Sequence, residues 1–333
     1  MTTTVTERAT TMKAVVRDRY GSPDVLTLDE VETPELEDDG ILVRVRAASV
    51  NRADWYELMG RPWVARPMMD GMRRPKSRLI GGDFAGTVEA VGEEVTDWQP
   101  GDDVFGVGGG SYAEYVSAGA AIARKPANLT FDEAAALPVA ALTALQGLRD
   151  HGQLQPGQKV LVNGASGGVG TFAVQIAKAL GGEVTAVCSP GNVEQARALG
   201  ADDVIDYTRE DFTRSGRRYD LLFDNAGSKS WSACRRILEP DATLVLVGAP
   251  KADPFFGPLR HIARKKVASL RGSQKLAFFI AKLKGEDLDV LRDLVEAGKV
   301  RPVVERQYEL SDVADALRYM GEGHAKGKIV ITV

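Results

Sequence analysis

The chain has 333 residues, a length that favours two domains over one ordinary core. Its 44% of hydrophobic and 26% of charged residues are typical of a soluble globular protein. The formal net charge of −4 gives no reason to expect a nucleic-acid partner or an anionic membrane surface, and no apolar run approaches the roughly 18 residues of a membrane span.

The N-terminal part is predicted to be a tail followed by an all-β domain. Residues 1–11 are polar and rich in threonine, without the apolar stretch of a signal peptide, and we expect a disordered tail. Over residues 12–130 short alternating strands are separated by turn signals, which indicates an all-β domain. The expected strands are Lys13–Val16, Ile41–Val45, Gly86–Val91 and Ala113–Val116.

Residues 57–78 form a long loop rich in methionine, arginine and aromatic residues. Loops of this length are commonly lids or substrate walls. Two interpretations stay open. The loop either shapes a substrate pocket, with Trp55 and Trp63 as apolar surfaces, or is a surface excursion packed on the β domain.

The residues from 131 to 271 are predicted to form a parallel doubly wound sheet. Helical segments alternate there with buried apolar strands, which is the rhythm of repeated βαβ units. The expected strands are Val160–Val162, Val184–Val187, Asp203–Ile205, Leu221–Phe223 and Thr243–Val247. In residues 272–333 we expect a helix over Glu286–Ala297 and a final strand over Lys328–Val333. Cys188 and Cys234 are the only cysteines and one of them lies inside an apolar strand, so we expect no disulfide framework and a reducing cytoplasm as the location.

A glycine turn after the first of these strands predicts a dinucleotide site. Ala165, Gly167 and Gly170 fit the G-x-G-x-x-G spacing, with alanine in first place. Together with Ser166, Gly168 and Val169 they open a helix whose N-terminal N–H groups and dipole would face the pyrophosphate. A glycine cluster by itself commonly marks only a flexible turn, but here the strand, the turn and the helix are all in place.

The end of the second strand favours NADPH over NADH. In NAD-specific domains an acidic residue about 20 positions after the glycines binds the ribose 2′-hydroxyl. This chain has Ser189 and Asn192 there instead, and both can donate hydrogen bonds to a 2′-phosphate. The alternative is that Ser189 only forms a turn at the strand end. Asn225 and Gly227 follow the fourth strand and Gly248 follows the fifth, at the edge where ligands bind in such sheets.

Several motifs together resemble the zinc-independent quinone oxidoreductases of the medium-chain dehydrogenase/reductase superfamily, including zeta-crystallin-like enzymes. They are Ala48-Ser49-Val50-Asn51 with Asp54 and Tyr56, the stretch from Gly81 to Gly86, Gln99-Pro100-Gly101-Asp102, Leu137-Pro138 through Ala144, and the glycine turn. The resemblance implies an α/β protein with a GroES-like β-barrel catalytic domain over 12–130 and a Rossmann NADP-binding domain over 131–271. Residues 272–333 would return to the catalytic domain. The family commonly pairs through the Rossmann sheet edge, which implies a homodimer contact near Thr243–Val247 and the following strand.

The resemblance also implies further cofactor contacts. It places Tyr207 at the 2′-phosphate, and Asn225, Gly227 and Gly248 near the ribose and nicotinamide. Leu270 and Arg271 take a similar place, although Arg271 is equally suited to a surface ion pair. Related sequences often carry Arg or Lys where this chain has Pro190-Gly191, so we expect Lys326 or Lys328 to supply the missing positive charge.

The ligands of a catalytic zinc are absent from the sequence. Zinc dehydrogenases of this fold need a thiolate and an imidazole, but the equivalent places here are Asn51 and Gly82. Asp83 remains, yet one carboxylate without soft partners makes a poor zinc site. The loop after Asp102 has no cysteine, so a structural zinc is not expected either.

Without a metal, the acceptor has to delocalise the charge that hydride transfer creates, which suits a quinone or an alkene conjugated to a carbonyl. The resemblance assigns three catalytic residues: Asn51 orients the ribose or the substrate oxygen, Tyr56 donates a hydrogen bond or a proton, and Thr143 lies at the cofactor amide. Each has an alternative, since Asn51 can cap a turn, Thr143 can pack in a helix and Tyr56 can be a wall residue. Solvent can equally supply the proton.

The predicted function is therefore an NADPH-dependent reductase of quinones or α,β-unsaturated carbonyls. A non-catalytic NADPH-binding protein, crystallin-like or regulatory, is the main alternative, because fold alone does not establish activity. A specialised partner in lipid or polyketide enoyl reduction is the third. The retained Asn51, Tyr56 and Thr143 favour the enzyme, and the absence of carrier-domain sequence speaks against the third.

Overall fold

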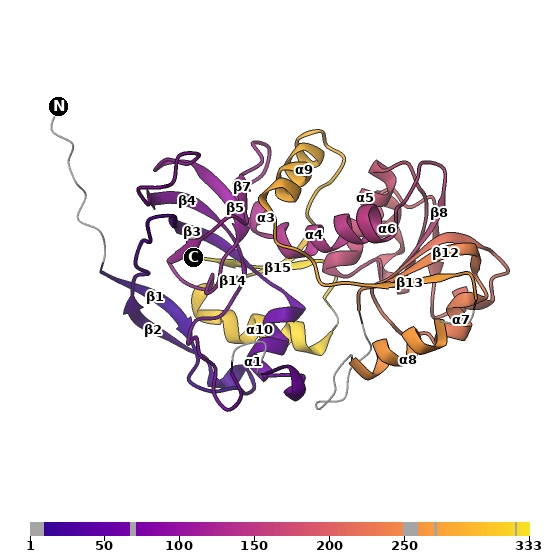
Figure 1. Ribbon diagram of the computed structural model, residues 1–333, viewed down its shortest axis with the longest axis horizontal. Helices are drawn as coiled ribbons and strands as arrows, with labels where there is room; N and C mark the ends of the chain where they lie inside the picture. Colours follow the sequence, from indigo (N-terminus) through magenta and orange to yellow (C-terminus); the bar gives the residue numbers. More distant parts are fainter. Residues whose placement is uncertain (1–9, 67–70, 249–258, 270–271, 324) are drawn as a thin grey trace.

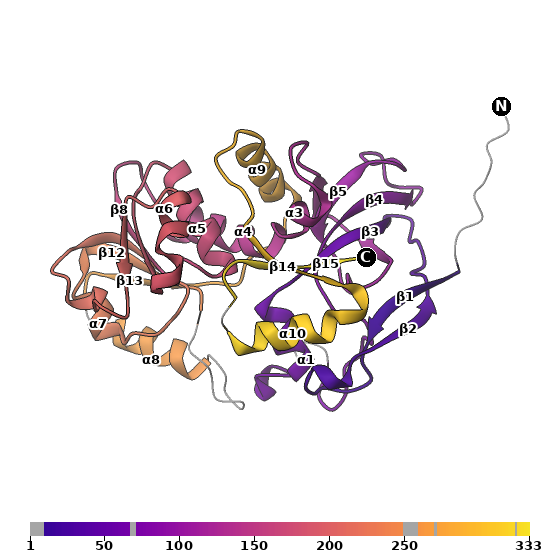
Figure 2. The same cartoon turned by 180° about the vertical axis from the view of Figure 1, so that it is seen from behind.

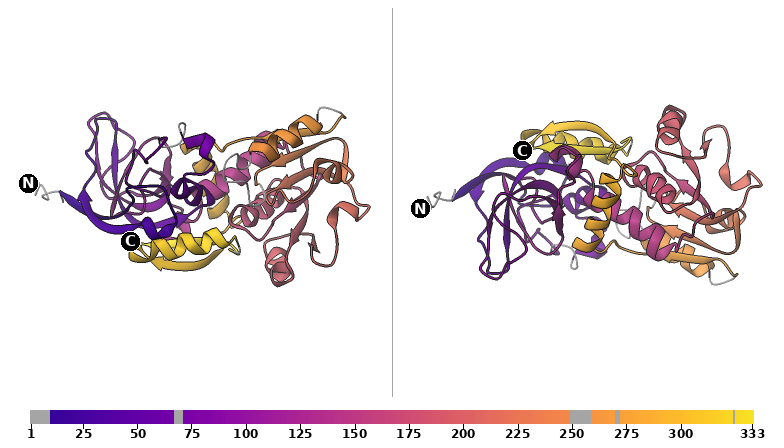
Figure 3. Two further views of the ribbon diagram at one scale, coloured as in Figure 1. Left: turned by 90° about the horizontal axis from the view of Figure 1, so that it is seen from below. Right: turned by 90° about the horizontal axis from the view of Figure 1, so that it is seen from above.

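The computed structural model describes residues 10–66, 71–248, 259–269, 272–323 and 325–333. These residues form two lobes that lie end to end, as the two views of Figure 3 show. One lobe is built on a seven-stranded sheet and the other on a six-stranded sheet. Figure 1 shows that the C-terminal segment returns from the second lobe to lie among the strands of the first lobe.

The seven-stranded sheet of the first lobe has the order β14-β15-β3-β4-β5-β7, with β6 paired to β3. Its strands are β3 (Ile41–Val50), β4 (Asp83–Val91), β5 (Asp103–Val107), β6 (Tyr115–Ala118), β7 (Ile122–Arg124), β14 (Val304–Glu309) and β15 (Lys328–Thr332). A separate antiparallel pair joins β1 (Thr11–Val16) to β2 (Thr27–Glu32). Because β15 pairs with β3 antiparallel, the last strand of the chain lies beside Asn51 and its neighbours (Figure 2).

The six-stranded sheet is parallel throughout and has the order β10-β9-β8-β11-β12-β13. Its strands are β8 (Lys159–Asn163), β9 (Glu183–Cys188), β10 (Asp203–Asp206), β11 (Tyr219–Asp224), β12 (Leu238–Leu246) and β13 (Lys275–Phe278). The strand order reverses between β8 and β11, and ligands bind at such a reversal, outside the carboxyl ends of the strands. The sheet thus places the glycine turn after β8 at a ligand-binding position.

Helices cover both faces of this sheet, because alternate strand residues point to opposite sides. Val160, Val162 and Phe223 belong to the core cluster under α4 and α5, whereas Leu161 and Leu222 belong to the cluster on the α7 and α8 side. The described helices are α1 (Arg52–Met59), α3 (Phe131–Ala135), α4 (Pro138–Gln146), α5 (Gly168–Ala179), α6 (Val193–Ala198), α7 (Trp231–Arg235), α8 (Leu259–Ser269), α9 (Gly285–Glu296) and α10 (Val313–Glu322). None of the helices in the described ranges is long and apolar enough to cross a membrane.

The first core cluster continues through α4 into the first lobe, where Ala47, Phe105 and Val330 join it. The two lobes therefore share buried apolar surface and do not hang on a flexible linker. In Figure 1, α4 lies between the two sheets.

The predicted fold class, a GroES-like domain with a Rossmann sheet, is confirmed. The predicted strands all appear, most of them longer by one or more residues; the helix predicted over Glu286–Ala297 is α9. Thr11 does not belong to a tail as predicted, because it begins β1, where its hydroxyl donates to Glu30. The exact boundaries proposed for the four parts, at 130 and 271, stay predictions.

Candidate functional site

The glycine turn after β8 is held by close backbone approaches. Gly164 has a φ of 85°, a conformation that favours glycine, and the N–H groups of Gly164 and Ala165 both donate to the Val187 carbonyl. A Cβ on Gly170 would lie 2.0 Å from the Gly164 carbonyl oxygen. The left-handed residue is thus Gly164, one position before the expected first place of the motif, which is why Ala165 is tolerated there. Ser166 to Val169 are only partly buried, so the start of α5 faces open space.

The turn meets the loop that follows β11. The Asn225 amide donates to the Gly164 carbonyl at 3.3 Å and lies 3.6 Å from the position that a Cβ on Gly167 would take. A Cβ on Gly248 would lie 1.7 Å from the Asn225 carbonyl oxygen, so only glycine fits after β12. Gly227 has a φ of 64°. The structure therefore brings the predicted Asn225, Gly227 and Gly248 together with the glycine turn.

A buried ion pair that the sequence analysis did not find supports this loop. Asp224 at the end of β11 accepts hydrogen bonds from the Asn163 amide (2.8 Å) and the Gly227 N–H (2.9 Å). Lys265 of α8 donates to its other oxygen at 2.9 Å, and both side chains are at most 3% exposed. The pair joins α8 to the loop of Asn225 and Gly227. Its only sequence signal is an acidic residue at the end of an apolar strand.

At the ends of β9 and β10 the structure gathers the residues predicted for the 2′-phosphate. The buried Asn192 amide donates to Ser189 Oγ at 2.8 Å, so the Ser189 hydroxyl keeps its own proton to donate outward. Tyr207 is exposed, and its N–H bonds to the carbonyl of Cys188, next to Ser189. Lys326 is exposed beside α6, where its carbonyl is 3.5 Å from the Gln195 amide. Asn192 thus orients Ser189 and does not face solvent itself.

The prediction that Lys328 could supply charge to the 2′-phosphate is wrong. Lys328 is 2% exposed, and its ammonium donates to Asn51 Oδ1 (2.6 Å), Asp83 Oδ2 (3.3 Å) and the Val50 carbonyl (3.4 Å). It points there because Asp83 is a fully buried carboxylate that needs a counter-charge. Lys326 is left as the candidate for the 2′-phosphate.

Asn51 and Asp83 form the centre of this buried polar group. Asn51 Nδ2 donates to Asp83 Oδ2 at 2.8 Å while its Oδ1 accepts from Lys328, and these two charged partners fix which way the amide points. Ser49 Oγ also donates to Asp83, at 3.0 Å. The stem of Lys328 lies 3.0 Å from the position that a Cβ on Gly168 would take. Lys328 therefore spans the distance between the glycine turn and Asn51.

Thr143 lies on α4, one turn after the residue whose N–H meets Asp83. The N–H of Val139, in the first turn of α4, donates to Asp83 Oδ1 at 3.1 Å, which fixes the helix over the buried carboxylate. Val139 and Thr143, one turn apart, are the partly exposed positions of an otherwise buried helix. The Thr143 hydroxyl donates to the Val139 carbonyl at 2.7 Å, so it can accept but has no proton left to donate.

Tyr56 and the two tryptophans lie on and after α1. Tyr56 is partly exposed, its ring packs edge-on against Trp55 at 5.3 Å, and no described residue hydrogen-bonds to its hydroxyl. Trp55 fills the space over Gly321 of α10, where a Cβ would lie 2.4 Å from its Nε1, so it packs against the C-terminal helix. Trp63 is half exposed, with the Arg66 guanidinium over its ring. Tyr56 remains a candidate; Trp55 serves packing.

Asp54, in the first turn of α1, is a second buried carboxyl group near Asn51. Its Oδ2 accepts from the Asn51 N–H at 2.7 Å and from the Tyr112 hydroxyl at 2.8 Å. Burial raises the pKa of Asp54 to about 7, and the neighbouring Asp83 adds to the rise, against the two hydrogen bonds that lower it. This carboxyl group therefore exchanges its proton near neutral pH.

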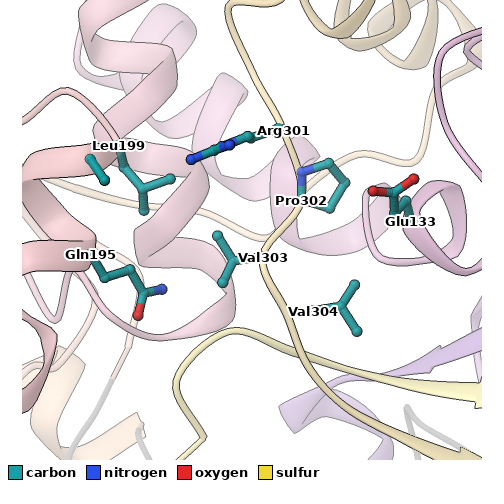
Figure 4. Close-up of a pocket in the computed structure, with 8 residues that line it drawn as sticks. Glu133, Gln195, Leu199, Arg301, Pro302, Val303 and Val304 are labelled. Atoms are coloured by element: carbon teal, nitrogen blue, oxygen red, sulfur yellow. The ribbon is translucent and has the colours of Figure 1, made fainter.

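Three further observations concern what the described site does not include. Leu270 and Arg271, predicted near the nicotinamide, lie outside the described residues. Within the described ranges no three His, Cys, Asp or Glu side chains are grouped as a metal site would require. A cavity of about 440 Å³ lies elsewhere, between α6 and the segment 301–304, lined among others by Gln195, Leu199 and Arg301 (Figure 4); none of the predicted site residues lines it.

Comparisons with known proteins agree with this geometry. Residues 37–127 match the alcohol dehydrogenase GroES-like domain, and residues 199–331 match a family described as zinc-binding dehydrogenase. Mitochondrial NAD(P)H oxidoreductase RTN4IP1 of Mus musculus is 35% identical over 99% of this chain and 91% of its own length. The chloroplastic NADPH-dependent alkenal/one oxidoreductase of Arabidopsis thaliana is 33% identical, over 96% and 79%. The quinone oxidoreductase structure from Coxiella burnetii superposes with a TM-score of 0.84 and 32% identity, covering 97% of this chain and 99% of that one.

The Lys265–Asp224 pair gives a stability prediction. The substitution Lys265→Met leaves the Asp224 carboxylate buried without its counter-charge, and we expect the free energy of unfolding to fall by about 3–5 kcal/mol. The matched control is Lys178→Met, which breaks a half-exposed pair with Asp202 at the same distance of 2.8–2.9 Å and should cost no more than about 1 kcal/mol. Equal losses in denaturant titrations of the two variants would contradict the assigned role.

Proposed function

The chain belongs to the medium-chain dehydrogenase/reductase superfamily, and we propose that it is a zinc-independent reductase that transfers hydride from NADPH to quinones or α,β-unsaturated carbonyl compounds. One observation carries the proposal: Lys328 lies against Gly168 at the glycine turn and holds Asn51 with its ammonium. The expected hydride source and the polar group that would face the acceptor are thus neighbours.

The residues of the site fit the cofactor. Gly164, Gly170 and Gly248 keep the backbone close where side chains would collide, and the first turn of α5 offers its N–H groups to a pyrophosphate. Bound NADPH supplies the hydride. Asn51 keeps one amide hydrogen that none of the described residues accepts, and it would donate this hydrogen to the acceptor oxygen or the cofactor ribose. The adjacent Lys328 ammonium polarises that amide, so it binds a developing negative charge more strongly.

The donor set supports chemistry without zinc. The positions of the thiolate and the imidazole are Asn51 and Gly82, and the Lys328 ammonium already neutralises Asp83 at 3.3 Å. A cation placed beside Asp83 would meet this ammonium, and like charges at such distances repel strongly in a buried site. A simple alcohol or aldehyde, whose alkoxide cannot delocalise its charge, is therefore a poor substrate in this proposal.

The first test is NADPH oxidation by a panel of acceptors. We expect turnover with quinones and with enones, and at least about tenfold lower kcat/KM with saturated aldehydes, because the site has no Lewis acid to stabilise an alkoxide. NADPH binding without turnover of any acceptor would instead support the non-catalytic alternative. Turnover of aldehydes alone, dependent on added zinc, would overturn the metal-free proposal.

The preference for NADPH is tested at Ser189. In Ser189→Asp a carboxylate faces the 2′-phosphate, so the KM for NADPH should rise at least tenfold while that for NADH stays constant or falls, since an acidic residue there binds a ribose hydroxyl. The control Ser189→Ala removes the hydrogen bond without adding charge and should raise the KM for NADPH only a few-fold. A variant Ser189→Asp that uses NADPH as well as the wild type would refute the assignment.

We also propose that the protein is a homodimer through the edge strand β13. The residues at and after this strand include exposed apolar side chains at Phe278, Ile280 and Leu283, with Ile280 83% exposed. The other edge of β13 pairs with no described strand. Such an edge is commonly covered in soluble proteins, and a second copy would cover it.

The cytoplasm stays our proposed location, because Cys188 and Cys234 are both free and buried.

The dimer proposal predicts the effect of a charge at this edge. Ile280→Lys should raise the dimer dissociation constant at least tenfold, because two lysines would meet at the contact, and analytical ultracentrifugation measures this directly. Val290→Lys on α9, where the residue is 39% exposed, is the control and should leave the mass unchanged. A wild-type protein that sediments as a monomer at all concentrations would exclude the dimer.

A further inference from the structure

The two oxygens of the Asp54 carboxyl group have different surroundings. The side chain is 5% exposed, and Oδ2 accepts both hydrogen bonds, from the Asn51 N–H and from Tyr112. None of the described residues hydrogen-bonds to Oδ1. Burial raises the pKa of Tyr112 well above its ordinary value, so this hydroxyl keeps its proton and acts as a donor to Oδ2. A proton bound by Asp54 therefore belongs on Oδ1.

Oδ1 faces the space that Gly82 leaves. It lies 3.9 Å from the position that a Cβ on Gly82 would take; apart from the chain neighbours of Gly82, Val107 Cγ1 at 3.8 Å is the only other atom of the described residues within 4 Å of that position. Gly82 and Val107 are partly exposed, whereas Asp83 beside them is fully buried. Glycine leaves no side chain between Asp54 Oδ1 and this partly exposed position. Oδ1 is thus directed at the backbone of Gly82 and has no hydrogen-bond partner among the described residues.

The charges around Asp54 favour its neutral form. Asp83 of β4 and Glu57 of α1 both raise its pKa, behind the larger effect of burial. Two nearby cations are already paired, because Lys328 of β15 binds Asp83 and Arg17, the residue after β1, binds Glu57 at 2.6 Å. With these two carboxylates compensated, an ionised Asp54 would add an uncompensated charge to this buried group, and a neutral Asp54 adds none.

We propose that Asp54 is the proton donor for enone reduction, delivering its Oδ1 proton to the acceptor through a water molecule in the space beside Gly82. The inference rests on the proposed reductase function. Hydride addition to the β-carbon leaves an enolate; the Oδ1–H bond then breaks, a C–H bond forms at the α-carbon and the enolate charge passes to Asp54. The carboxylate is held by the Asn51 N–H and the Tyr112 hydroxyl until it takes a proton back from solvent.

The step distinguishes two acceptors. An enolate has to be protonated on carbon, which is slow without a positioned acid, whereas a hydroquinone anion takes its proton on oxygen from water. Asp54→Asn keeps the shape and an acceptor oxygen for both hydrogen bonds but has no acidic proton. We expect its kcat for an enone to fall at least about tenfold, and more steeply than its kcat for benzoquinone.

The pH profile gives a readout that a purely structural role would not move. Because the neutral acid is the active form, wild-type kcat for the enone should fall as pH rises through about 7, and Asp54→Asn should lose this inflection. Tyr112→Phe removes a hydrogen bond that lowers the pKa of Asp54, so its inflection should move to higher pH. Asp132→Asn on α3 is the control: burial raises the pKa of Asp132 too, yet the group lies outside the site, and the profile should not change.

The outcomes separate this inference from the proposed function. A wild-type protein that reduces neither acceptor overturns the reductase proposal and the inference with it. A wild-type protein that reduces quinones but no enone overturns the inference alone. An Asp54→Asn variant that is folded, as checked by thermal unfolding, and that matches the wild type in enone rate and pH profile also overturns the inference alone. A Tyr112→Phe variant whose pH inflection does not move overturns it too.

Discussion

The buried carboxylate of Asp83 is the constraint on which the rest of the site depends. A charge with no solvent exposure is tolerated only when it is paired and hydrogen-bonded. Asp83 meets this condition with four partners from three separate segments: Ser49 and Asn51 where β3 runs into α1, the Val139 N–H of α4, and Lys328 of β15. Removing any one segment would leave the carboxylate short of a partner. The same charge therefore fixes the C-terminal strand against β3 and sets α4 between the lobes.

The cofactor side depends on a comparable buried charge. Asp224 holds the Gly227 N–H, Asn163 and Lys265, and so ties the loop after β11 to the strand that carries the glycine turn and to α8. Around it the backbone approaches too closely for side chains, as the 1.7 Å from a Gly248 Cβ to the Asn225 carbonyl shows. Two buried carboxylates, each with one lysine, thus organise the two halves of the site, and Lys328 touches both halves through its stem and its ammonium.

The strands and the glycine turn could be predicted because their signals are local. Buried apolar runs marked five of the six strands of the parallel sheet, with β13 the exception, and the spacing of Gly167 and Gly170 marked the start of α5. The partners of the lysines could not be predicted, since Lys328 meets Asn51 across 277 residues and Lys265 meets Asp224 across 41. A long-range ion pair leaves no periodic pattern in the sequence. Lys328 was misassigned for this reason: from sequence a lysine suggests a free charge for a phosphate, whereas burial in the fold committed it to Asp83. The position of Gly164 was missed because the spacing rule does not report φ.

The charges of the site also explain why its chemistry should favour a conjugated acceptor. With Lys328 paired to Asp83 and Asp54 protonated, the polar group around Asn51 has no net charge before the reaction. Hydride transfer adds one negative charge, and no full positive charge is free among Lys328, Arg17 and their partners to balance it. An acceptor that spreads the charge over several atoms keeps this cost low, and a proton from Asp54 moves the charge from the substrate to a carboxylate that the Asn51 N–H and the Tyr112 hydroxyl already hold. The alkoxide formed from a saturated aldehyde cannot spread its charge and would need a proton as soon as the hydride arrives. In this proposal the proton comes from Asp54 through a water molecule beside Gly82, and not from a direct contact.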